Sequence, residues 1–114
     1  MEIEKRQIEG IVVLNLFGDL MGDGSEKLKK VIKEEISKEN INFVINMQRV
    51  IWMNSVGLGG IINSLTQLRA AGGDLRVCGL PERIKRPLEI TKLDTVIKNY
   101  DSLEQAINSF SGEA

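Results

Sequence analysis

The hydroxyl group of Ser55 is the side chain in this sequence whose position best suits chemistry. It lies in Asn54-Ser55-Val56-Gly57-Leu58-Gly59, between a strand-like apolar segment and residues with helical spacing. Asn and Ser side chains both accept hydrogen bonds from the free N–H groups of a helix's first turn, so either Asn54 or Ser55 can be the N-cap. The sequence therefore predicts a strand-to-helix joint that presents a hydroxyl group.

Three glycines weaken the start of the predicted helix. Gly57, Gly59 and Gly60 each cost about 1 kcal/mol relative to alanine in an exposed helix. Two explanations stay open. Either the backbone approaches a neighbouring element closely, or a partner must reach the backbone and the Ser55 hydroxyl without side chains in the way.

The composition argues against an enzyme, a cofactor and a metal site. Histidine is absent from all 114 residues, which removes the commonest general base, the Ser-His-Asp triad and imidazole ligands. Gly57-Leu58-Gly59-Gly60 fits neither the GxGxxG pattern nor a P-loop, so the hypothesis of a nucleotide-binding protein has little support. The single Cys78 lies in an apolar segment and is expected to be a buried core thiol.

Length and charge indicate one domain, residues 1–114, that neither binds nucleic acid nor enters a membrane. The net charge is −1 and few aromatic residues are available to stack on bases. No apolar run reaches the roughly 18 residues of a membrane span, and the N-terminal residues lack the pattern of a secretory signal. We therefore expect a cytoplasmic protein.

The hydrophobic pattern predicts an α/β fold, with a mixed sheet, an antiparallel N-terminal edge and about four helices. Predicted strands cover residues 2–8, 11–17, 41–47, 74–80 and 96–100. Predicted helices run over residues 25–37, from the Asn54-Ser55 joint to about residue 71, after Pro81, and from residues 101–105 to Phe110, with residues 111–114 frayed. Residues 18–24 are expected to form a loop capped by Asp23 or Ser25, and residues 48–53 a connection. Trp52 fits either an interface anchor or core lining.

Three segments together resemble the STAS domain (sulfate transporter and anti-sigma factor antagonist), in particular the small stand-alone bacterial antagonists. These segments are Gly18-Asp19-Leu20, Asn54 to Gly59, and Gly72-Gly73. The resemblance implies that Ser55 is phosphorylated by a partner serine kinase, itself the anti-sigma factor, and dephosphorylated by a phosphatase. The unphosphorylated antagonist binds the kinase and releases the sigma factor, thereby regulating transcription.

The resemblance also implies where partners bind, and it leaves an alternative open. The implied contact surface comprises Asp19, Met21, Gly22, Asp23, Asn54, Ser55, Val56, Gly57, Leu58 and Gly59. Two residues depart from the family pattern, because Asn54 and Met21 stand where acidic residues are common. The alternative is a STAS interaction subunit of a transporter or sensory complex that acts without phosphorylation. The sequence does not indicate an oligomeric state.

Overall fold

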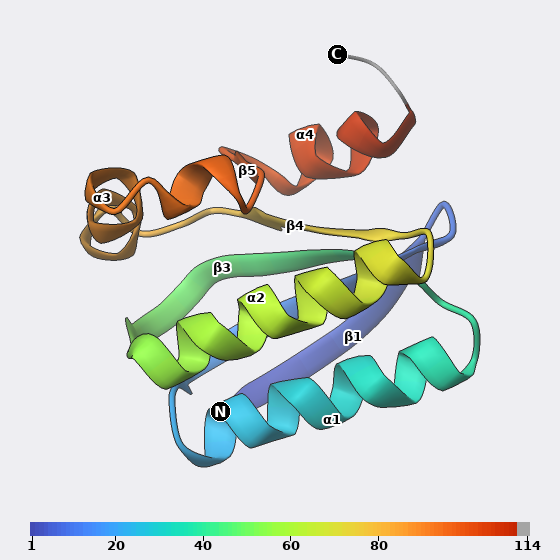
Figure 1. The fold of residues 1–114 in the computed structure, drawn as a ribbon, viewed down its shortest axis with the longest axis horizontal. Helices are drawn as coiled ribbons and strands as arrows, with labels where there is room; N and C mark the ends of the chain where they lie inside the picture. Colours follow the sequence, from blue (N-terminus) through green and yellow to red (C-terminus); the bar gives the residue numbers. More distant parts are fainter. Residues whose placement is uncertain (112–114) are drawn as a thin grey trace.

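A computed structural model describes residues 1–111 as a five-stranded mixed sheet with helices on both faces (Figure 1). The strands are β1 (Glu2–Ile8), β2 (Ile11–Leu20), β3 (Asn42–Met53), β4 (Asp74–Cys78) and β5 (Asn99–Tyr100). The helices are α1 (Asp23–Ser37), α2 (Ser55–Ala70), α3 (Glu82–Ile90) and α4 (Leu103–Asn108), with short 3-10 turns η1 (Leu93–Thr95) and η2 (Ser109–Ser111). The predicted fraying of residues 111–114 lies, beyond Ser111, outside the described residues.

The strands lie in the order in which they occur in the chain. β1 pairs with β2 antiparallel, and β2, β3, β4 and β5 are parallel neighbours. Parallel neighbours need long crossover connections, and here these contain the helices α1, α2 and α3. The predicted fold class, a mixed sheet with an antiparallel N-terminal edge and four helices, is confirmed.

β2 is covered on both faces, as its nearly unbroken apolar sequence predicts. Val12, Leu14 and Leu16 belong to the larger core, which α1, α2 and α3 share. Ile11 and Val13 belong to a smaller core on the opposite face, formed with α4. In Figure 1 the sheet accordingly runs between α1 and α2 on one side and α4 on the other.

Two strands run further than the sequence pattern predicted. β2 continues to Leu20, so the connection to α1 contains only Met21 and Gly22, and β3 continues to Met53. The register with β2 shifts twice, because Asn46 to Arg49 lies opposite Asn15 to Phe17 and Val50 to Met53 lies opposite Gly18 to Leu20. Each shift gives β3 one extra residue, as in a β-bulge, which breaks the alternation of inward and outward side chains. The predicted loop over residues 18–24 and connection over residues 48–53 were therefore wrong.

The helix ends follow local hydrogen bonding. The predicted cap of α1 was wrong: Gly22, at φ +55°, precedes the helix and no side chain caps it, while Ser25 is buried. Asn54 caps α2, because its Oδ1 accepts a hydrogen bond from the Gly57 N–H at 3.0 Å. α2 ends at Ala70, before Gly72 at φ +90°, as predicted.

The last third of the chain has less regular structure than predicted. β4 ends at Cys78, and β5 contains only Asn99 and Tyr100, because Val96 and Ile97 turn back onto η1 and donate their N–H groups to the Leu93 carbonyl oxygen. Pro81 is the N-cap residue of α3 and Pro87 lies inside that helix. Cys78 is buried as expected, and burial raises the pKa of its thiol to about 11, which makes it a poor nucleophile.

Candidate functional site

Ser55 is the first residue of α2 and is exposed where β3 ends. The capping role that either residue could have taken belongs to Asn54. The Ser55 hydroxyl therefore stands at the positive end of a 16-residue helix without being needed to cap it. No acidic residue lies in the first turn of α2 to repel an anion.

The structure bears out the first explanation for the glycines at Gly57, whereas the second, access for a partner, stays a prediction for Gly59. A Cβ atom on Gly57 would lie 2.1 Å from the Leu20 carbonyl oxygen, so this glycine allows the backbone of β2 to touch α2. A Cβ atom on Gly59 would meet nothing within 4 Å. Gly57 is thus required by packing, whereas Gly59 leaves open space on an exposed part of the helix.

The contact at Gly57 brings the end of β2 beside Ser55. Leu20 pairs with Met53, two residues before Ser55, and Met21, Gly22 and Asp23 follow directly. Met21 is 38% exposed, Gly22 and Asp23 are exposed, and Asp19 is half-buried. The two segments that the resemblance singled out, residues 19–23 and 54–59, therefore meet at one edge of the molecule.

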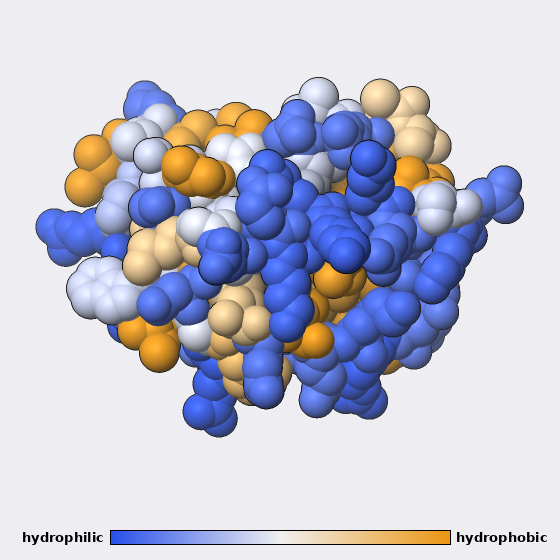
Figure 2. All heavy atoms as spheres, turned by 90° about the horizontal axis from the view of Figure 1, so that it is seen from below, coloured by the Kyte–Doolittle hydropathy of each residue, from blue (hydrophilic) through white to orange (hydrophobic). Residues whose placement is uncertain are grey.

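The structure adds exposed Ile51 to this surface, and it also exposes Trp52 and Val56, which sequence reasoning had already considered for it. Ile51, Trp52 and Val56 are 53%, 60% and 58% exposed, which rules out core lining for Trp52. Ile51 and Trp52 lie in the second bulged segment of β3, where the usual alternation fails. Figure 2 shows a mainly hydrophilic face over α1. Hydrophobic residues appear at the left end of this view, the end at which α2 begins in Figure 1.

A groove of about 260 Å³ lies on the other side of Ser55, between the start of α2 and α3. Its lining residues are Met53, Asn54, Ser55, Leu58, Arg83, Ile84, Pro87 and Leu88. Arg83 is the charged member of this set, and sequence reasoning missed it because α3 is distant from Ser55 along the chain. Within residues 1–111, no three His, Cys, Asp or Glu side chains are grouped so as to hold a metal ion. In the same part of the chain, no helix has both the length and the apolar character needed to cross a membrane.

Comparison with known proteins identifies the family. The STAS domain family matches residues 2–106, and the chain belongs to it. The anti-sigma-B factor antagonist of Listeria monocytogenes is 30% identical over 98 residues, covering 86% of this chain and 85% of the relative. The match thus extends over nearly the whole of both chains.

Solved structures agree on the fold. The anti-sigma factor antagonist SpoIIAA in its unphosphorylated form superposes with a TM-score of 0.82 at 20% identity, covering 99% of each chain. The phosphorylated form of the Bacillus cell fate determinant SpoIIAA gives a TM-score of 0.75 at 20% identity, covering 96% of this chain and 99% of the other.

Proposed function

We propose that this chain is a cytoplasmic single-domain anti-sigma factor antagonist, not an enzyme, whose binding to an anti-sigma factor serine kinase is switched off by phosphorylation of Ser55. The observation that carries the proposal is the exposed Ser55 hydroxyl at the start of α2, with capping left to Asn54. Family membership and the antagonist relatives support it. SpoIIAA, a structural neighbour, is known in phosphorylated and unphosphorylated forms.

The reaction at Ser55 would be phosphoryl transfer from ATP. A bond forms between the Ser55 oxygen and the γ-phosphorus, the bond to the β,γ-bridging oxygen breaks, ADP leaves, and a base of the kinase takes the hydroxyl proton. The reverse change needs a phosphatase, which adds water across the new bond. The antagonist contributes access, because Gly59 leaves the approach to the helix open.

The binding surface would comprise residues 19 and 21–23 from the end of β2 and residues 54–59 from the start of α2. The exposed side chain of Trp52 extends it and, together with Val56, supplies the apolar and aromatic area that anchors protein interfaces. A phosphate adds nearly two negative charges to the middle of this surface. Binding is then lost through charge and bulk, with little refolding.

A second candidate is a STAS subunit that holds a transporter or sensory complex without phosphorylation. Asn54 favours it, because this position is commonly acidic in the family's phosphorylated pattern. The neutral Asn54, however, repels a phosphate less than an aspartate would. We therefore place the phosphorylation switch first.

The test uses purified protein, ATP and a serine kinase of the anti-sigma factor type. We expect mass spectrometry to find one added phosphate on Ser55, and none on the Ser55→Ala variant. In a calorimetric titration, Ser55→Ala should bind the kinase like wild type, and Ser55→Asp should bind at least about tenfold more weakly, which corresponds to about 1.4 kcal/mol. Ser111→Asp, which adds the same charge at exposed Ser111 in η2, is the matched control and should bind normally. If Ser55→Asp and Ser55→Ala bind the kinase equally and no phosphate is transferred, the phosphorylation switch is wrong and the second candidate remains.

A further inference from the structure

Arg83 on α3 is a cation that lines the same groove as Ser55 and is held by two backbone carbonyl oxygens. Its Nε donates to the Ile51 carbonyl oxygen at 2.7 Å and its Nη2 to the Val50 carbonyl oxygen at 3.0 Å. Both acceptors are neutral. Within residues 1–111, no carboxylate forms a salt bridge with Arg83. Arg83 and Ser55 line the same groove of about 260 Å³.

Arg83 also occupies a position that a strand would otherwise take. β4 pairs with β3 only as far as Cys78 opposite Asn46, so β4 forms no strand pairing with the segment of β3 beyond Asn46. The guanidinium group supplies the donors that Val50 and Ile51 lack there. The end of β3, including the exposed Ile51 and Trp52, is thus held in part by one side chain from α3.

We propose that Arg83 is the internal partner of the phosphate on phosphorylated Ser55, and that it leaves the carbonyl groups of β3 when it binds this phosphate. The inference rests on the proposed phosphorylation of Ser55. Phosphorylation would then change the molecule in two neighbouring places. The phosphate adds charge at Ser55, and the end of β3 loses the Arg83 contacts that hold it in the unphosphorylated protein.

Charge and hydrogen bonding favour the exchange. The bonds from Arg83 to the carbonyl oxygens have one charged partner, whereas a guanidinium–phosphate pair joins two opposite charges and often forms two parallel N–H···O bonds. The planar fork of arginine also fits two phosphate oxygens at once, which a lysine cannot do. At the start of α2 the Gly57 N–H is already occupied by Asn54, so the helix offers fewer free donors than an uncapped start would. A side-chain cation in the groove supplies the remaining counter-charge.

The exchange has a consequence for partner binding. When Arg83 moves to the phosphate, the carbonyl oxygens of Val50 and Ile51 lose their donors and must turn to water. The segment carrying Ile51 and Trp52 is then less well fixed, and it borders the proposed binding surface. Phosphorylation would therefore weaken binding both by repulsion at Ser55 and by loosening the neighbouring apolar contact.

The experiment installs phosphoserine at position 55 during translation, so that it does not depend on any kinase. We expect the Nε–H resonance of Arg83 to shift on phosphorylation in a ¹⁵N-labelled sample, while that of Arg86, which lies on α3 outside the groove lining, stays in place. The ³¹P signal of phosphoserine titrates with a second pKa of about 6. Removing the charge in Arg83→Gln should raise this midpoint by about half a unit or more, because a nearby cation favours the doubly charged phosphate.

The controls separate a charge partner from a structural residue. Arg86→Gln should leave the ³¹P midpoint unchanged, and Arg83→Lys, which keeps the charge without the fork, should give an intermediate value. Other charged side chains of these elements are common to all samples, among them Asp19, Asp23, Lys29, Arg49, Arg69, Glu82, Lys85 and Glu89. If Arg83→Gln does not fold, the Arg83 resonance in wild type and the Arg83→Lys titration remain decisive.

Two results would overturn the inference. One is an Arg83 resonance that does not respond to phosphoserine, and the other is a ³¹P midpoint that is the same in wild type, Arg83→Lys and Arg83→Gln. Either result leaves the proposed function untouched, because a kinase could still phosphorylate Ser55. Conversely, absence of phosphate transfer by the kinase would contradict the proposed function without affecting these spectra.

Discussion

At the scale of single residues, the site depends on a division between two neighbouring polar side chains. Asn54 satisfies the Gly57 N–H, and Ser55 keeps an exposed hydroxyl. In a joint where serine is the cap, modifying the serine would remove the cap as well. Under the proposed function, a phosphate on Ser55 would leave the hydrogen bond between Asn54 and the Gly57 N–H in place. This arrangement suits a switch that changes surface charge without unfolding the helix.

The two nearby glycines predict opposite responses to the same substitution. Gly57→Ala should lower the free energy of unfolding by about 2–3 kcal/mol, because its Cβ atom would overlap the Leu20 carbonyl and force a backbone shift. Gly59→Ala meets open space and should raise stability by up to about 1 kcal/mol through helix propensity. Urea denaturation followed by circular dichroism measures both.

The pair also separates packing from partner access. If Gly59 keeps the surface clear for the kinase, Gly59→Ala should weaken kinase binding or slow phosphate transfer while the protein becomes more stable. A Gly57→Ala variant as stable as wild type would show that β2 and α2 can separate without cost.

At the scale of elements, the parts of the fold that follow a regular sequence pattern could be predicted. Apolar runs located β2, β3 and β4, and Gly72 located the end of α2. The strand-to-helix joint at Ser55 was also located, because a polar joint and glycines leave a clear signal. The two contact segments came from the family resemblance, and their role in partner binding stays a prediction. The ends of β2 and β3 were not, since bulges remove the alternation by which strands are recognised. Arg83 was beyond prediction, because its role depends on how α3 packs beside β3.

The start of α2 allows a test of the cap itself. Asn54→Ala removes the acceptor for the Gly57 N–H and should lower the free energy of unfolding by about 1 kcal/mol. Asn54→Asp keeps an acceptor and should lie within a few tenths of a kcal/mol of wild type. Chemical denaturation distinguishes the two variants.

Asn54→Asp also tests whether the residue at position 54 affects phosphate transfer to Ser55. It restores an acidic residue beside Ser55 at nearly constant stability, so a change in the rate of phosphate transfer reports recognition alone. Equal losses of stability in Asn54→Ala and Asn54→Asp would mean that the cap is not what these variants change.

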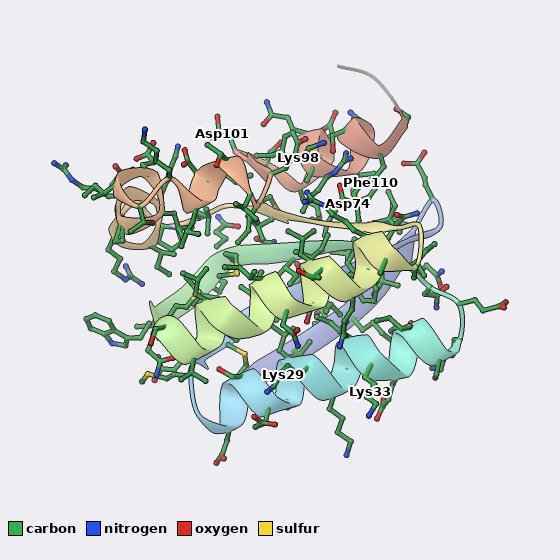
Figure 3. The ribbon with its side chains drawn as sticks, in the orientation of Figure 1. Lys29, Lys33, Asp74, Lys98, Asp101 and Phe110 are labelled. Carbon is green, nitrogen blue, oxygen red and sulfur yellow. The ribbon has the colours of Figure 1, made fainter. Side chains whose placement is uncertain are left out.

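At the scale of the whole molecule, a few polar side chains tie outer elements to the sheet. Arg76 on β4 donates to Asp74 at 3.1 Å and to Ser109 at 2.6 Å, and its guanidinium lies 4.1 Å from the centre of the Phe110 ring. Figure 3 shows Asp74 and Phe110 together between β4 and the C-terminal helical segment. These contacts hold η2 on one face of the sheet, far from the end where α2 begins (Figure 1).

Glu35 connects α1 to the sheet in a similar way. It is 4% exposed, and its carboxylate accepts hydrogen bonds from Lys5 on β1 at 2.9 Å, from Lys38 at 3.2 Å and from Asn40 at 3.0 Å. The Lys5 hydrogen bond, with smaller contributions from Asn40 and Lys38, holds the pKa of Glu35 below its usual value of 4.5, although burial opposes this. The same contact raises the pKa of Lys5 above 10.5. A charged pair thus joins the edge strand to the end of α1.

This tie predicts a pH-dependent difference in stability. The folded pKa of Glu35 lies below its unfolded value, so its contribution is fully present above about pH 4.5 and is lost as the pH falls through the folded pKa. Glu35→Gln should therefore lower the free energy of unfolding by about 1–2 kcal/mol at pH 7, because the remaining amide cannot satisfy Lys5. The gap to wild type should narrow in acid. Exposed Glu34→Gln is the matched control and should follow wild type across urea titrations from pH 3 to pH 8. A gap that stays constant with pH would assign the loss to packing rather than to the charge, and the carboxylate would then not be what joins α1 to β1.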